Sequence, residues 1–178
     1  MRDAEASARQ APTLELPDTA GEQRALPAQG EAPATVVFWT CNHCPYAIAW
    51  HDRLVAAAHD YAPRGVDFLA VNSNDPDRYP ADSPEAMRER VEREDWPFPY
   101  LWDESQEAAR EWGARTTPHL FVLDSDLRIR YEGAPDADHR DPGLNAAWLR
   151  EALDALLAGS DPAQASTEPV GCSIKWRS

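Results

Sequence analysis

Two cysteines separated by two residues, Cys41 and Cys44, are the feature that most constrains this sequence. They directly follow the apolar, β-branched run 35–40, which is typical of a strand buried on both faces, and they precede a helical pattern. A helix N-terminus carries unpaired N–H groups and about half a positive charge, so it stabilises a thiolate placed there. We therefore expect Cys41 to be the exposed, nucleophilic thiol and Cys44, one turn further on, to be the more buried resolving thiol.

A zinc site is the main alternative for a pair of cysteines at this spacing, but it needs two further ligands. The only other cysteine is Cys172, and no second cysteine or histidine pair follows it. His43 lies inside the motif, while His51 and His59 fall on later turns of the same helix. The pattern favours a redox pair, and we expect no metal, nucleotide or organic cofactor.

Composition narrows the choice of partners. The 178 residues carry a formal net charge of −14, which disfavours binding to nucleic acid and to anionic membranes. No apolar run approaches the roughly eighteen residues of a transmembrane helix. Residues 1–5 are polar and no apolar segment follows them, so we find no secretory signal and expect a cytoplasmic protein.

The order of the predicted elements indicates one α/β domain over residues 12–159, after a disordered leader (1–11) and before a tail (160–178). The strand–helix–strand order implies parallel pairing with a right-handed crossover. Strands are predicted at 13–16, 23–26, 35–40, 66–72, 98–102, 119–123 and 128–131, and helices at 41–62, 83–94, 105–112 and 145–158.

Four separated motifs resemble one family. They are Cys41–Tyr46, Phe98–Ala108, Thr117-Pro118 and Gly171–Trp176. In this order they are similar to the thioredoxin superfamily, in the branch shared with peroxiredoxins and TlpA-like proteins, and most of all to its peroxiredoxin-like thioredoxin family proteins. The resemblance covers roughly residues 13–176. It implies a thioredoxin fold, with a central mixed β-sheet flanked by helices, an N-terminal β-hairpin and an inserted helix.

The resemblance also implies roles for residues around the thiol pair. Pro118 matches the cis-proline that faces the two cysteines, and Thr117 would present its backbone to an extended substrate; the alternative is an ordinary trans proline. Asn42 and Trp39 would flank the bound substrate, although core packing is an equal reading for Trp39. His43 occupies a position where disulfide isomerases also carry histidine and would stabilise a thiolate, unless it is a solvated loop residue.

Two points stay open in the sequence. Thioredoxin's buried acid is missing from the run 35–40, so the group that deprotonates Cys44 is open, with Glu31 or a water molecule as candidates. Cys172 is either packed in a tail that docks through Ile174 and Trp176, or a third redox thiol. We favour packing, in which case Cys172 is not needed for turnover.

The function we expect is thiol–disulfide exchange by Cys41 and Cys44 on protein or small-molecule disulfides, with electrons from a thioredoxin- or glutathione-type donor. A peroxiredoxin-like thiol peroxidase is the first alternative. The Pro-x-x-x-Thr/Ser-x-x-Cys pattern of peroxiredoxins, counted back from Cys41, falls on Phe38 and Ala34, and their arginine position falls on Pro118. A non-catalytic thioredoxin-fold adaptor is the second alternative, which the intact cysteine pair disfavours.

Overall fold

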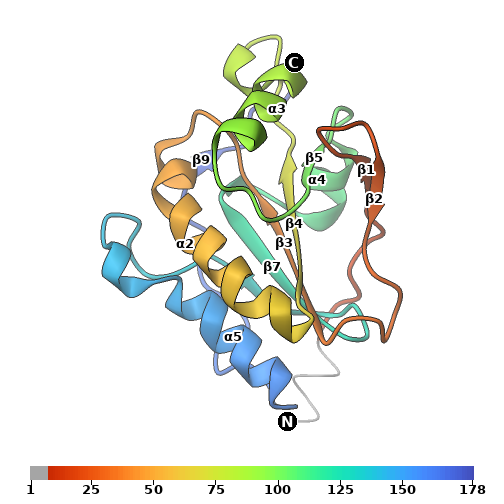
Figure 1. The fold of residues 1–178 in the computed structure, drawn as a ribbon, viewed down its shortest axis with the longest axis vertical. Helices are drawn as coiled ribbons and strands as arrows, with labels where there is room; N and C mark the ends of the chain where they lie inside the picture. The colour runs from red at the N-terminus through yellow and green to blue at the C-terminus, as the bar shows by residue number, and fades with distance from the viewer. Residues whose placement is uncertain (1–7) are drawn as a thin grey trace.

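The fold is built on a five-stranded mixed sheet (Figure 1). The computed structural model describes residues 8–178 of the chain. The strand order is β5-β4-β3-β7-β8, in which the first three strands are parallel and the last two are antiparallel to their neighbours. These strands are β3 (Ala34–Trp39), β4 (Asp67–Asn72), β5 (Tyr100–Trp102), β7 (His119–Asp124) and β8 (Ile129–Gly133). The predicted mixed sheet is confirmed.

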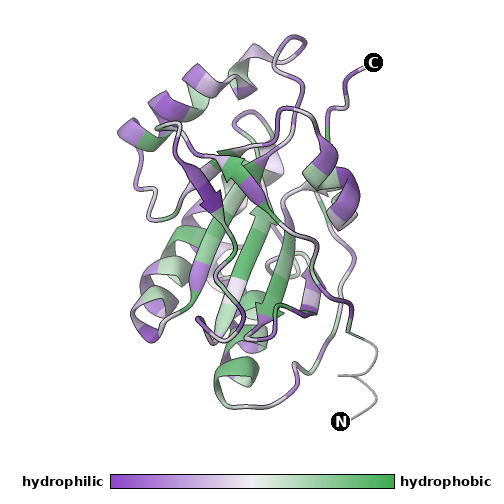
Figure 2. Ribbon diagram, turned by 90° about the vertical axis from the view of Figure 1, so that its right-hand side faces the viewer, coloured by the Kyte–Doolittle hydropathy of each residue, from purple (hydrophilic) through white to green (hydrophobic). Residues whose placement is uncertain are grey.

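Strand β3 is the centre of the sheet because all six of its residues are buried. It pairs in parallel with β4 on one side and antiparallel with β7 on the other. Alternate side chains point to opposite faces, so Val36 and Phe38 join one core cluster while Val37 and Trp39 join the other. Figure 2 shows the resulting apolar sheet strands at the middle of the molecule. Because both faces of β3 are apolar, other elements must pack on both faces of the sheet.

Helices α2 (Pro45–Tyr61) and α5 (Ala147–Leu157) cover one face of the sheet and lie side by side in Figure 1. The shorter α4 (Glu107–Trp112) packs on the other face, together with residues next to the hairpin of β1 (Glu15–Pro17) and β2 (Gln23–Ala25). The insertion between β4 and β5 holds α3 (Pro84–Arg93), which is the inserted helix that the resemblance implied. The chain also forms short 3-10 helices at Ala62–Arg64, Pro80–Asp82 and Pro142–Leu144.

The tail returns to the body of the domain and ends beside the sheet. Its strand β9 (Cys172–Ser173) pairs antiparallel with β6 (Thr116–Thr117), which directly precedes β7. Ile174 is 2% exposed, whereas Trp176 remains 37% exposed. The Arg110 guanidinium lies over the Trp176 ring at 5.1 Å, so this ring contacts a charged side chain rather than an apolar patch.

The predicted leader covers residues 1–11, of which residues 1–7 lie outside the described residues. Further on, Arg9 accepts a hydrogen bond from the backbone N–H of Ile129, and Ala11 donates one to Leu127. Among the described residues, no helix combines the length and the apolar character needed to cross a membrane.

Candidate active site

All three cysteines meet at one place, where β3 ends, α2 begins and β9 passes. Cys41 and Cys44 form a small buried cluster with Ala47, and Cys172 packs against it. Thr117 lies within reach of both buried sulfurs: its Oγ1 is 3.4 Å from the Cys41 Sγ, and its carbonyl oxygen is 3.3 Å from the Cys44 Sγ. The Thr117–Pro118 peptide is cis. The fold therefore brings together the cysteine pair, the threonine–proline dipeptide and the tail thiol.

The expectation that Cys41 is the exposed thiol at the helix N-terminus is wrong. Both Cys41 and Cys44 are 0% exposed, and α2 begins only at Pro45, which makes Cys44 its N-cap. Proline favours the first position of a helix because its missing N–H is not needed there. The Cys41 backbone is held outside the helix, where its carbonyl oxygen accepts a hydrogen bond of 2.9 Å from Arg90.

The two thiols of the reduced pair differ in acidity, and Cys44 has the lower pKa. The neighbouring Cys41 thiol, and to a smaller extent Cys172 and the backbone of Ala47, lower the pKa of Cys44 to about 4. The pKa of Cys41 is raised, because its thiol donates to Cys44, is buried and faces the Asp82 carboxylate. The helix N-terminus thus acts on Cys44, and Cys41 keeps the shared proton.

This assignment predicts the outcome of a titration that follows the ultraviolet absorbance of the thiolate. In the reduced wild-type protein we expect one thiolate to form with a midpoint near pH 4, since that is the pKa of Cys44. The transition should be absent from the Cys44→Ser variant. It should persist in Cys41→Ser, where a hydroxyl still donates to the Cys44 sulfur. If the low-pH transition were lost in Cys41→Ser but kept in Cys44→Ser, the thiolate would belong to Cys41 instead.

His43 is not a free loop residue. Its Nδ1 contacts the Oδ2 of Asp82, and its ring stacks on Tyr79 with centroids 5.1 Å apart. Asp82 is completely buried, and its carboxylate also accepts hydrogen bonds from the Asn42 backbone N–H and the Asn72 and Asn74 side chains. A buried carboxylate fixed in this way holds the imidazole in one orientation beside Cys41.

Asp82 is a buried acid near Cys41 that the sequence did not reveal. Glu31, the candidate named from the sequence, lies before β3 at the end away from the cysteines, where its carboxylate accepts a hydrogen bond from the Ala28 N–H. Asp82 instead comes from the insertion between β4 and β5, far along the chain from the cysteines. Its only signal in the sequence is a position at the end of a polar, proline-rich loop, which does not show burial.

One atom each from Cys41, His43 and Asp82 lies within 4.8 Å of the other two. A thiolate, an imidazole and a carboxylate are ligand types that zinc accepts. The Asp82 oxygens, however, already accept hydrogen bonds from three asparagines as well as the contact with His43. The carboxylate is therefore committed to protein donors, which suits an acid–histidine pair beside a thiol better than a metal centre.

The two residues predicted to flank the substrate, Asn42 and Trp39, have structural contacts instead. The Asn42 Oδ1 accepts hydrogen bonds from the Tyr100 hydroxyl at 2.8 Å and from Arg90 at 3.1 Å. Trp39 is completely buried, and its Nε1 donates to the Ser73 hydroxyl at 2.9 Å. Core packing is the reading that fits Trp39, and Asn42 ties the loop of the cysteine pair to β5 and α3.

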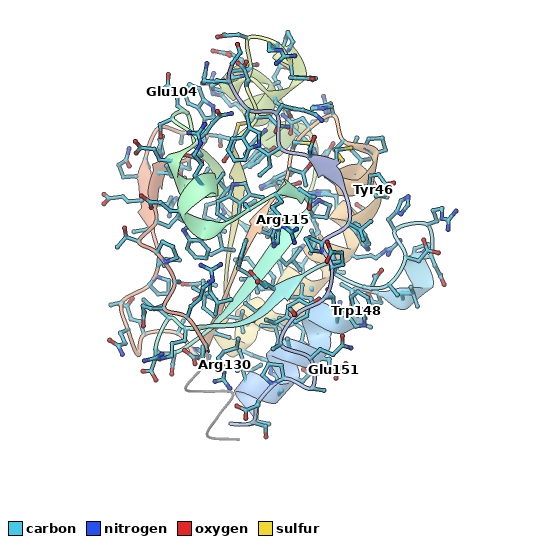
Figure 3. All side chains as sticks on the ribbon, turned by 180° about the vertical axis from the view of Figure 1, so that it is seen from behind. Tyr46, Glu104, Arg115, Arg130, Trp148 and Glu151 are labelled. Carbon is cyan, nitrogen blue, oxygen red and sulfur yellow. The ribbon has the colours of Figure 1, made fainter. Side chains whose placement is uncertain are left out.

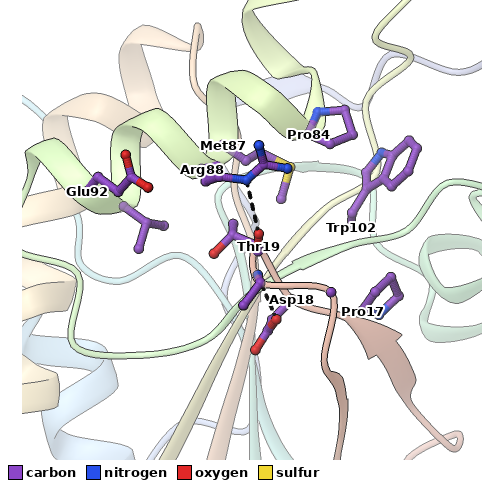
Figure 4. A pocket seen from close by; sticks show the side chains of 11 residues that line it. Pro17, Asp18, Thr19, Pro84, Met87, Arg88, Glu92 and Trp102 are labelled. Atoms are coloured by element: carbon purple, nitrogen blue, oxygen red, sulfur yellow. Dashed lines mark hydrogen bonds between the residues drawn. The ribbon is translucent and has the colours of Figure 1, made fainter.

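A surface groove of about 600 Å³ lies away from the thiols, between the β1–β2 hairpin and α3 (Figure 4). Its lining is mainly apolar, with Met87 and Trp102 among the side chains, and it includes neither a cysteine nor a histidine. The one guanidinium there, Arg88, donates to the Thr19 carbonyl at 3.3 Å. The groove offers no reactive group, so the thiol cluster is the candidate active site.

His119, the residue after the cis-proline, is expected to make stability depend on pH. Burial and the nearby Arg115 and Arg9 lower its pKa from the ordinary 6.5 to about 4, and its Nδ1 accepts the Arg115 N–H at 3.1 Å. Below pH 6.5 the unfolded chain binds a proton that the folded chain refuses, so the free energy of unfolding should fall as pH drops from 6.5 to about 4.

The His119→Asn variant isolates this contribution, because an amide oxygen can accept the same backbone hydrogen bond but does not titrate. Urea unfolding of both proteins across this pH range measures it. On acidification the free energy of unfolding should fall more in the wild-type protein than in the variant. The difference between the two pH slopes should correspond to the binding of at most one additional proton on unfolding. Parallel pH profiles would mean that His119 is protonated in the folded state as readily as in the unfolded one.

Comparison with known proteins agrees with this geometry. The model of the AhpC/TSA family matches residues 8–132. An uncharacterized conserved protein from Geobacillus kaustophilus is similar over 96% of this chain and 92% of that chain, with 40% identity and a TM-score of 0.90. A hypothetical protein from Sinorhizobium meliloti is similar over 96% of this chain and 94% of that chain, with 34% identity and a TM-score of 0.89.

More distant structures share the fold alone. A thiol-disulfide oxidoreductase from Bacteroides fragilis has 17% identity and a TM-score of 0.59, over 80% of this chain and 98% of that chain. The comparison with curated proteins finds no match. The thioredoxin fold and the peroxiredoxin-like resemblance seen in the sequence are confirmed, and, because the family model spans most of its length, the chain belongs to the AhpC/TSA family.

Proposed function

We propose that this protein is a thiol–disulfide oxidoreductase whose redox pair is Cys41 and Cys44. Family and fold support a thiol-based redox function in general. The observation that carries the finer proposal is the packing of Cys41 and Cys44 in one buried cluster at the start of α2. The two residues are in contact, and the pKa of Cys44 is lowered while that of Cys41 is raised, which suits disulfide exchange.

In the proposed reaction the Cys44 thiolate attacks one sulfur of a substrate disulfide. The other substrate sulfur leaves with the bonding electron pair and takes up a proton. The Cys41 sulfur then attacks Cys44 in the mixed disulfide, the second substrate thiol leaves, and Cys41 and Cys44 are oxidised to a disulfide. A thioredoxin- or glutathione-type donor in the cytoplasm would return two electrons to the pair. The attacking thiol thus differs from the one expected from the sequence, because the helix begins later.

A thiol peroxidase is the second candidate, and membership of the AhpC/TSA family is what favours it. The peroxiredoxin pattern Pro-x-x-x-Thr/Ser-x-x-Cys places a hydroxyl three residues before the reactive cysteine. Counted from Cys44, the threonine position is Cys41 and the proline position is Val37. The hydroxyl that would polarise a peroxide is therefore missing whichever cysteine is used, while a second thiol stands in its place.

Two assays on the same preparation decide between these functions. The first follows insulin reduction with dithiothreitol as the electron donor, and the second follows hydrogen peroxide consumption with the same donor. We expect insulin reduction well above the rate of dithiothreitol alone, and peroxide consumption close to that of an unrelated thiol protein. Fast peroxide consumption without insulin reduction would establish the peroxidase instead. If the protein were inactive in both assays, the remaining interpretation would be a non-catalytic thioredoxin-fold adaptor.

A further inference from the structure

The tail crosses the active site as a strand laid against the residues before the cis-proline. Cys172 and Ser173 pair antiparallel with Thr117 and Thr116, so that Cys172 stands opposite Thr117. The approach is close: a Cβ atom on Gly171 would lie 2.1 Å from the Thr117 carbonyl oxygen. Only glycine allows the two backbones to meet at this distance. Figure 3 shows this edge from behind, with β9 running near the labelled Arg115 and Tyr46.

The tail is fixed on both sides of this crossing. Before it, the Thr167 backbone N–H donates to the Glu132 carbonyl at 3.0 Å, and the Thr167 hydroxyl accepts the Ala134 N–H at 3.0 Å. After it, the buried Ile174 donates its N–H to the Arg115 carbonyl at 3.0 Å. The Lys175 carbonyl then accepts hydrogen bonds from the Asp75 N–H at 2.9 Å and the Gln106 side chain at 3.0 Å. The position of Cys172 between these anchors is therefore defined by the fold.

The Cys172 side chain faces the cysteine pair. It packs against the cluster of Cys41, Cys44 and Ala47. Side chains alternate along a strand, so the next residue, Ser173, points away and is exposed. Cys44 consequently has a thiol contact on each side, Cys41 from the preceding loop and Cys172 from the tail.

We propose that Cys172 is a third redox thiol, which resolves a mixed disulfide on Cys44 in competition with Cys41. In this step the Cys172 sulfur attacks the Cys44 sulfur, the bond between Cys44 and the substrate breaks, and the substrate sulfur leaves with the electron pair and the Cys172 proton. Cys44 and Cys172 end as a disulfide, the substrate has gained two electrons, and Cys41 remains a thiol. This inference rests on the proposed function, since it needs a reactive Cys44.

The inference replaces the reading favoured from the sequence, in which the tail thiol is only packed. Packing alone would be satisfied by an apolar side chain of similar size and would not require a thiol beside the cysteine pair. The contact also gives the tail a chemical role. Once Cys172 is bonded to Cys44, the strand that lies along Thr117 is covalently closed over the site.

The test uses the full chain with Cys41→Ser, which leaves Cys44 and Cys172 as its only thiols. The reduced variant is treated with oxidised glutathione, and the products are identified by mass and by peptide mapping after alkylation. We expect an intramolecular Cys44–Cys172 disulfide with no retained glutathione. The matched control adds Cys172→Ser and Ser173→Cys, which moves the thiol to the opposite side of the strand. In this control we expect Cys44 to retain glutathione.

A stable glutathione adduct on Cys44 in the Cys41→Ser variant, with Cys172 alkylated as a free thiol, would overturn the inference. The same would follow if the control formed its disulfide as readily as the variant. Circular dichroism of each reduced protein shows that the comparison is made on folded chains. A failure here is distinguishable from failure of the proposed function, because the latter is read from insulin reduction by the wild-type protein.

Discussion

Replacing Cys44 with serine should abolish insulin reduction, down to the rate of dithiothreitol alone. Cys44 is the N-cap of α2 and the thiol of the pair whose pKa is lowered, so the variant lacks the attacking group of the proposed reaction. A serine hydroxyl at this position does not ionise at neutral pH and cannot form a disulfide. Because serine is nearly isosteric with cysteine and can cap a helix, we expect the variant to remain folded.

The companion variant Cys41→Ser should lose less activity than Cys44→Ser. It keeps the Cys44 thiolate, and Cys172 remains in contact with that sulfur to resolve the mixed disulfide. The double variant Cys41→Ser/Cys172→Ser should then be as inactive as Cys44→Ser. The reverse ranking, with Cys44→Ser more active than Cys41→Ser, would show that Cys41 is the attacking thiol.

Replacing Asp136 with alanine should lower the free energy of unfolding by about 3–5 kcal/mol, the largest effect on stability that we expect. The reason is that the buried guanidinium of Arg53 loses its counter-ion. Both side chains are buried, and the Arg53 Nη1 lies 3.0 and 2.9 Å from the two carboxylate oxygens. The same carboxylate accepts the Trp50 Nε1 at 2.9 Å and the Ala146 N–H at 2.9 Å. It thus joins α2 to the segment that leads into α5.

Urea unfolding measures this prediction, and the exposed pair of Arg150 and Asp60 provides the control. Their N–O distance of 2.7 Å is as short as that of the buried pair, but the Asp60 side chain is 60% exposed. Exposed ion pairs contribute roughly 0–1 kcal/mol, so Asp60→Ala should have a small effect. Equal losses in the two variants would contradict the account of the buried pair.

Much of the fold was predictable because its signals are local. The apolar β-branched residues of β3 indicate a strand covered on both faces, and Ser83 with Pro84 indicates the start of α3, where the Ser83 hydroxyl accepts the Ala86 N–H. The mixed sheet, the N-terminal hairpin and the inserted helix were instead implied by the resemblance to the thioredoxin superfamily. Element ends were less predictable: the helix expected at 41–62 begins only at Pro45.

The arrangement of the site was harder to predict because it depends on contacts between distant segments. Cys41 lies outside α2, and Arg90, from the inserted helix, binds its carbonyl oxygen there. Asp82 is buried because the insertion folds back over the cysteine loop, and a lone aspartate after a polar loop does not indicate this. The pairing of Cys172 with Thr117 joins two segments far apart in the chain, and neither has a strand pattern of its own.

The most direct test of the central claim is a redox titration of the Cys172→Ser variant in glutathione buffers. Free thiols are alkylated after an acid quench and mapped by mass spectrometry at each ratio of oxidised to reduced glutathione. The account predicts a single two-electron transition in which Cys41 and Cys44 lose their thiols together and are recovered as one disulfide. If the two cysteines instead remain thiols across the titration, or acquire glutathione independently of each other, they are not a redox pair and the account is contradicted.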